Sequence, residues 1–182
     1  NFNADPTNYL VEGYIATPGD DGIYIVSEKP KPAAKVGNTE YDSMDEAIEN
    51  WTNNTTLTLL ANVTLSDVIK ISSTEMHTLD LGTFTMTAAK GKDAIQITAE
   101  GRSSASYALD IKADATNPGG IIASSAVVKT SGKSNVQDRP IIRFYNGVFK
   151  ASNIISHSGS NGTNCPQFWF YGGEFKGNVS AN

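Results

Sequence analysis

The sequence predicts an all-β fold, a right-handed parallel β-helix (solenoid) with a short N-terminal capping helix and a preceding β-hairpin. Apolar and polar residues alternate over short segments, glycine and asparagine separate these segments, and one segment recurs after 26 residues. Alternation with a period of two is typical of half-buried strands. A recurring unit of short strands and turns is typical of stacked coils that bury apolar side chains against one another.

Residues 1–33 are expected to form an N-terminal β-hairpin segment that ends in a proline-rich linker. Alternating runs at 13–17 and 22–26 flank Pro18-Gly-Asp-Asp21, which is typical of a hairpin turn. The segment Lys29-Pro-Lys-Pro32 interrupts backbone pairing and stiffens the chain. We therefore expect a boundary at residue 33, followed by a capped β-helix module over 34–182.

One segment, residues 43–51, carries the pattern of a helix. Ser43 can cap its first turn, and a glutamate three residues later completes the sequence of a capping box. Met44, Ile48 and Trp51 fall on one face of such a helix. We expect Ser43, Met44, Ile48 and Trp51 to cap the N-terminal end of the solenoid.

The remaining strands are expected where apolar residues alternate, and a weak repeat relates two of the segments. The expected strands cover 56–60, 68–71, 78–81, 84–86, 94–97, 107–111 and 141–144. Phe144-Tyr-Asn-Gly-Val-Phe-Lys-Ala151 aligns with Phe170-Tyr-Gly-Gly-Glu-Phe-Lys-Gly177. The same frame aligns Gly82 with Gly147. It also aligns Gly120, which lies 27 residues before Gly147. Each glycine is expected at a corner between strands.

Segments 36–48, 56–65 and 78–86 together resemble the opening of the pectin-lyase-like right-handed β-helix modules of bacterial cell-surface and adhesin proteins. The resemblance implies that a hairpin and a short helix cap the first coils. Residues 2–14 and the hairpin after them resemble the tail of such a module. The resemblance therefore implies that the chain is one unit of a tandem array, with copies of itself joined in tandem or stacked head to tail.

Composition argues against several function classes. The net charge of −5 and the pI of about 5.0 do not suit nucleic-acid binding. The single cysteine, Cys165, excludes an intrachain disulfide and a zinc site made of cysteines. The sequence has no apolar run of the length that membrane insertion requires.

The pectin-lyase-like fold hosts lyases and glycoside hydrolases, but we expect no catalysis from this chain. Asp20 and Asp21 lie in the hairpin turn, whereas Asp80 and Asp110 fall on different coils with no third acid beside them. His77 and His157 stand alone, so we expect no metal and no cofactor. The favoured function is a non-catalytic structural or adhesive module, located outside the cell or on its surface, that builds a stalk, fibre or filament. A polysaccharide lyase or hydrolase is the less favoured alternative.

Four residues near the C-terminus suggest a second kind of function. If Phe144 points inward, strand alternation directs Arg143 and Tyr145 outward, and the repeat places Trp169 and Tyr171 beside them. Aromatic rings with a guanidinium group can stack on sugar rings or dock a partner. The alternative function is therefore a carbohydrate-binding module that recognises surface glycans. If a neighbouring loop or module covers these residues instead, we expect them to serve assembly.

Six Asn-x-Ser/Thr sequons are candidates for glycosylation. They begin at Asn50, Asn53, Asn54, Asn62, Asn161 and Asn178. Because the chain is rich in serine and threonine, composition alone also accounts for several of them.

Overall fold

The computed structural model of the chain describes residues 2–98, 106–131, 139–158 and 166–181. The chain divides into two compact units, Asn1–Lys31 (unit 1) and Pro32–Asn182 (unit 2). The division falls inside the proline-rich segment that was expected to be a linker.

Unit 1 is built around a two-stranded antiparallel hairpin. A 3-10 helix, η1 (Thr7–Tyr9), precedes β1 (Tyr14–Pro18) and β2 (Tyr24–Glu28). The backbone of Phe2 exchanges two hydrogen bonds with that of Tyr24, 3.1 and 2.7 Å long, which adds a bridge beside the hairpin. The turn includes Gly22, whose φ of +75° suits glycine.

The first sheet of unit 2 has seven strands and mixed pairing. Its strand order is β16-β14-β11-β8-β5-β3-β4. From β5 to β16 all neighbours are parallel, whereas β3 is antiparallel to both β4 and β5. The strands are β3 (Ala34–Val36), β4 (Thr39–Tyr41), β5 (Thr56–Leu59), β8 (His77–Asp80), β11 (Ser106–Lys112), β14 (Pro140–Phe144) and β16 (Gln167–Phe170).

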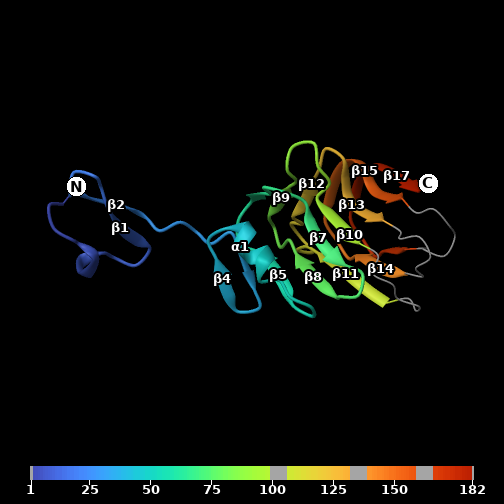
Figure 1. Cartoon of the computed structure of the whole chain (residues 1–182), viewed down its shortest axis with the longest axis horizontal. Helices are drawn as coiled ribbons and strands as arrows, with labels where there is room; N and C mark the ends of the chain where they lie inside the picture. The colour runs from blue at the N-terminus through green and yellow to red at the C-terminus, as the bar shows by residue number, and fades with distance from the viewer. Residues whose placement is uncertain (1, 99–105, 132–138, 159–165, 182) are drawn as a thin grey trace. The chain divides into compact units, whose positions relative to one another are not determined.

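The second sheet has eight strands, all parallel to their neighbours. The order is β6-β9-β12-β15-β13-β10-β7, and β17 also pairs with β15. Figure 1 shows β7, β10, β13, β15 and β17 following one another in this curled sheet. The strands are β6 (Val63–Thr64), β7 (Ile69–Ser72), β9 (Thr85–Thr87), β10 (Ile95–Thr98), β12 (Gly120–Ile122), β13 (Ala126–Ser131), β15 (Val148–Ser158) and β17 (Glu174–Ala181).

The predicted right-handed β-helix solenoid is therefore wrong, although the fold is mostly β. The strands form one mixed sheet and one curled parallel sheet. Two features separate this arrangement from uniform coils of about 26 residues. The long strand β15 pairs with both β12 and β13, which joins two sets of strands into one sheet. The spacing of paired residues is also uneven, since 33 residues separate Asp110 from Arg143.

The only helix of unit 2 in the described residues, α1 (Met44–Glu49), lies where the sequence predicts it. The backbone N–H of Glu46 donates to the Ser43 hydroxyl over 3.2 Å, which satisfies one free donor of the first turn. Met44 and Trp51 are buried, and Ile48 is half-buried against the same core. No helix in the described ranges has the length and apolar character needed to cross a membrane.

The core of unit 2 is the apolar layer between the two sheets. In β5 the side chains of Leu57 and Leu59 are buried, while Thr56 and Thr58, which alternate with them, are half-buried. Phe144 of β14 and Phe149 of β15 are fully buried and meet edge to face, with ring centroids 5.2 Å apart. Alternation thus directs one set of side chains inward and leaves the other on the outer faces.

Candidate functional site

The candidate site lies on the outer side of the seven-stranded sheet, at its β16 end. Phe144 points inward, and the residues that flank it, Arg143 and Tyr145, are half-buried. Arg143 pairs in register with Trp169, and Tyr171 follows β16. We call the group formed by Tyr107, Arg143, Tyr145, Trp169 and Tyr171 the aromatic face.

Arg143 occupies the centre of the aromatic face and is held there by Asp110. Its Nε and Nη2 donate to the two carboxylate oxygens of Asp110, each over 2.6 Å. Burial lowers the pKa of the Arg143 guanidinium, but the hydrogen bonds and charge of Asp110 raise it more, so the pKa lies above its ordinary value. Asp110 is 3% exposed, so this ion pair is part of the framework of the site.

Tyrosine rings lie on two sides of the guanidinium. The central carbon of the Arg143 guanidinium is 3.8 Å from the centre of the Tyr107 ring and 5.5 Å from that of Tyr145. Trp169 meets Tyr107 edge to face, with centroids 6.0 Å apart. Contacts between a cation and the face of an aromatic ring are attractive and fix the orientation of both groups.

Tyr145 and Tyr171 form a stacked pair next to this cluster. Their ring centroids are 5.0 Å apart and their planes differ by 13°. The ammonium of Lys112 lies 5.4 Å from the centre of the Tyr145 ring. Partial burial, and then the nearby charge of Asp110, raise the pKa of the Tyr145 phenol above its ordinary value.

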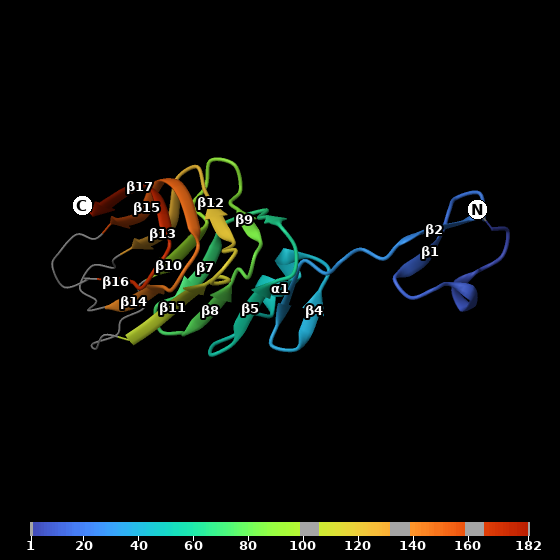
Figure 2. The ribbon, with the colours of Figure 1, turned by 180° about the vertical axis from the view of Figure 1, so that it is seen from behind.

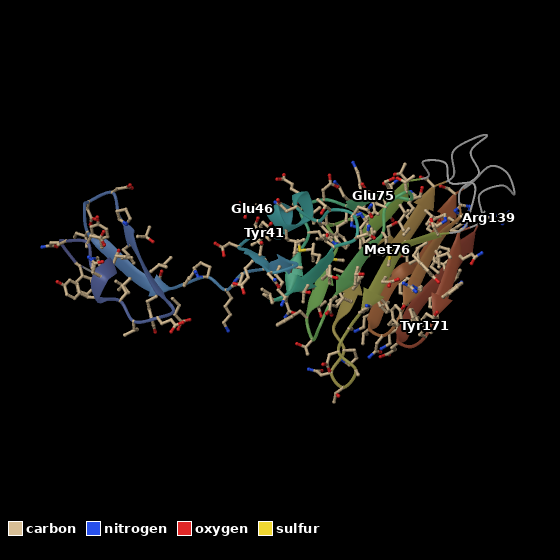
Figure 3. All side chains as sticks on the ribbon, turned by 90° about the horizontal axis from the view of Figure 1, so that it is seen from below. Tyr41, Glu46, Glu75, Met76, Arg139 and Tyr171 are labelled. Carbon is tan, nitrogen blue, oxygen red and sulfur yellow. The ribbon has the colours of Figure 1, made fainter. Side chains whose placement is uncertain are left out.

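The aromatic face is open to solvent in unit 2. Trp169 is 38% exposed and Tyr171 is 59% exposed, and Tyr107 is 37% exposed. Large aromatic side chains that remain exposed in one patch often mark a binding surface. Figure 3 labels Tyr171 among the last strands of unit 2.

Reasoning from the sequence found four of the five residues of the aromatic face and missed Tyr107. The pairing of β11 with β14 shifts register between Tyr107 and Leu109, as in a β-bulge. Ala108 and Leu109 are both fully buried, so simple alternation along β11 is broken. The residues of a bulge carry no distinctive sequence pattern here, so alternation from Asp110 could not place Tyr107 on the outer face.

Three of the four aspartates that are candidates for catalysis have structural partners. Asp21 accepts the N–H of Ile23 within the hairpin turn, and Asp80 accepts the N–H of Gly82. Asp110 is engaged by Arg143. Within the described ranges, no three residues of the metal-binding types His, Cys, Asp and Glu gather in one place.

The two histidines lie in different parts of unit 2. His77 is buried against Trp51, and its Nε2 lies 3.0 Å from the Glu75 carboxylate. Its Nδ1 is buried without a hydrogen-bond partner among the described residues. The Nδ1 of His157 lies 2.8 Å from the Thr130 hydroxyl. His77 is therefore a core residue.

Several of the sequon asparagines form side-chain hydrogen bonds with backbone groups. The side-chain oxygen of Asn53 accepts the N–H of Met76 over 2.9 Å, and that of Asn62 accepts the N–H of Thr85 over 2.8 Å. Asn50 ends α1 and donates to a helix carbonyl. Asn54 has a φ of +62°, and Asn178 is exposed on β17. Asn161 lies outside the described residues, as does Cys165.

Comparison with known proteins adds no relative to this description. No protein-family model, no curated protein and no solved structure matches the chain. The resemblance to pectin-lyase-like surface modules therefore remains a prediction.

Proposed function

We propose that the protein is a non-catalytic carbohydrate-binding module and that its aromatic face stacks on the sugar rings of a glycan. The observation that supports the proposal is the exposure of Trp169 and Tyr171 beside a guanidinium held by a buried carboxylate. Aromatic rings with a polar atom at one end suit ligands that have both apolar faces and hydroxyl groups, as pyranose rings do.

The supporting residues hold the aromatic face in place before any ligand arrives. Tyr145 lies behind Tyr171 as a stacked ring, and Asp110 fixes the plane of Arg143. A surface that is already ordered loses little side-chain entropy when it binds. Rigidity of this kind favours a flat, regular ligand such as a polysaccharide chain.

The polar groups of the site can form hydrogen bonds with sugar hydroxyl groups. Two of the five N–H donors of Arg143 are used by Asp110, which leaves three for a ligand. The exposed Lys112 and the phenol groups of Tyr145 and Tyr171 add further donors. Since Asp110 already neutralises Arg143, the proposal favours neutral hexose units over a ligand bound mainly by charge.

A glycan array tests the proposal directly. The full chain is compared with Trp169→Ala and Tyr171→Ala, and with Tyr9→Ala as the matched control. Tyr9 is an 88% exposed tyrosine that is not part of the aromatic face, so its removal should leave binding unchanged. Each site variant should lose about tenfold or more in affinity, which corresponds to about 1.4 kcal/mol. Binding by neither the full chain nor any variant, or equal binding by all, would contradict the proposal.

The structural hypothesis, a stalk, fibre or filament on the cell surface built by head-to-tail stacking, stays a prediction. The observation that favours association is the exposure of apolar side chains at the last strands, with Phe170 47% and Val179 67% exposed. Electron microscopy of the concentrated protein would reveal filaments if copies stack in one direction. The lack of catalysis also stays a prediction, and release of unsaturated product from a polyuronate would contradict it.

A further inference from the structure

The two sheets of unit 2 end in strands that have one partner each. Among the described strands, β16 pairs only with β14, and β17 pairs only with β15. Figure 2 shows β17 as the last strand beyond β15. An outer strand of this kind carries backbone N–H and C=O groups that can pair with another strand.

The apolar side chains of these last strands continue the stacks of the core. Phe170 lies on Phe144 and Phe175 lies on Phe149, in each case with centroids 5.1 Å apart and planes 13° apart. The inner members, Phe144 and Phe149, are fully buried, whereas Phe170 is 47% exposed. Among the described residues, Phe170 and Phe175 are the last rings of these stacks, and one more strand in each sheet would cover them.

The opposite end of unit 2 is covered by its own residues. Met44, Ala47 and Trp51 of the α1 region are buried there against the core. Figure 3 shows Glu46 of α1 at one end of unit 2 and Tyr171 at the other. Among the described residues of unit 2, the layer at the other end is uncovered, and the same layer on a second copy of the chain is an apolar surface that matches it.

The backbone of β17 sets the register in which two copies can pair. The N–H of Glu174 donates to the carbonyl of Gly147, which leads into β15, so its N–H points away from the open edge. Because N–H and C=O directions alternate along a strand, the N–H and C=O of Phe175 point toward the open edge. Two β17 strands that run antiparallel can then exchange hydrogen bonds between their Phe175 residues.

The same register brings opposite charges together. With the two Phe175 residues facing each other, Glu174 of one copy lies opposite Lys176 of the second copy, and the reverse pair forms across the symmetry axis. Within one chain these two side chains already form an exposed ion pair of 2.6 Å. Exposed ion pairs add little binding energy. The affinity between two copies therefore comes from burial of apolar side chains, and the charges select the register of the two strands.

We propose that the protein forms a symmetric dimer in which the β17 strands of two copies pair antiparallel about Phe175. The interface is isologous, so it closes at two copies. It uses the apolar layer of Phe170, Phe175 and Val179, whereas the proposed glycan site uses the outer face of the neighbouring sheet. The dimer is therefore independent of the proposed function.

Charge reversal at the two complementary positions tests both the dimer and its register. Sedimentation of the full chain over a concentration series should show a monomer–dimer equilibrium. Glu174→Lys alone and Lys176→Glu alone should each weaken the dimer about tenfold, because each places like charges opposite one another. An equimolar mixture of the two variants should restore dimers, since every facing pair is then opposite in charge.

Lys92→Glu is the matched control, because Lys92 forms an exposed ion pair of 2.6 Å with Asp67 away from β17. It should leave the monomer–dimer equilibrium unchanged.

A monomer at every concentration would overturn the proposed dimer. A series of ever larger species would also overturn it, because it would indicate open head-to-tail association. Dimers that persist in each variant alone would overturn the register. Circular dichroism should show native folding of all variants, since both positions are exposed.

Discussion

Arg143 and Asp110, which lie 33 residues apart in the chain, face each other on neighbouring strands and share two hydrogen bonds of 2.6 Å. The carboxylate is almost fully buried and the guanidinium is partly so, with side-chain exposures of 5% and 15%. A bidentate ion pair of this kind fixes the plane of the Arg143 guanidinium. The pair connects the buried framework of β11 to the exposed rings of the aromatic face.

Removing the carboxylate charge should destabilise the fold. Asp110→Asn leaves the Arg143 guanidinium half-buried without a counter-charge, which we expect to lower the free energy of unfolding by about 3 kcal/mol. Urea unfolding followed by circular dichroism measures the change. Asp67→Asn, which breaks the exposed pair with Lys92, should cost about 0.5 kcal/mol or less. Equal losses in both variants would contradict a structural role for the Arg143 pair.

The raised pKa of Tyr145 predicts a specific response to alkaline pH. Burial favours its neutral phenol, so the phenol stabilises the fold at pH values below about 10, where tyrosine in the unfolded chain is also neutral. This contribution is lost as the pH rises through the pKa of the folded state. Absorbance at 295 nm should show a late-ionising tyrosine that Tyr145→Phe removes. Persistence of the late step in that variant would assign it to another residue.

A methyl group at Gly120 should disrupt the pairing of β12 with β15. A Cβ at this position would overlap the Val148 carbonyl oxygen of the neighbouring strand. We expect Gly120→Ala to lower the free energy of unfolding by about 2 kcal/mol, because the clash is with backbone that cannot rotate away. Gly91→Ala is the comparison, since Gly91 has a φ of +77° and open space around it. It should cost about 1 kcal/mol from backbone strain alone, and the reverse order in thermal unfolding would contradict this account.

A buried ring and an exposed ring of the phenylalanine stacks should contribute differently to the free energy of unfolding. Phe149→Ala removes a fully buried ring and should lower the free energy of unfolding by about 4 kcal/mol. Phe170→Ala removes a ring that is 47% exposed and should cost less than half as much in the monomer. Chemical denaturation at low protein concentration measures both. Similar losses would indicate that Phe170 is already covered in solution.

Local features of the fold followed from the sequence because they depend on neighbouring residues. The hairpin of unit 1, the helix after Ser43 and most early strands lie close to the predicted positions. The 26-residue repeat places Phe144 beside Phe170 and Phe149 beside Phe175, and these residues are indeed paired. The extension of the repeat to Gly120 was off by one residue, since Gly120 pairs with Val148.

Tertiary structure decided which strands share a sheet. By itself, the sequence determined where the helix, the hairpins and most early strands form, because alternation, glycine and capping act over a few residues. It also placed Arg143 and Tyr145 on the outer face. It did not indicate β13 or the second half of β15. The joining of β12 and β13 through β15, the bulge that brings Tyr107 to Arg143 and the ion pair with Asp110 depend on contacts between distant segments. Side chains alternate with a period of two along every strand, so the local pattern cannot select the partner strand or detect an extra residue. Only packing of the core makes that choice.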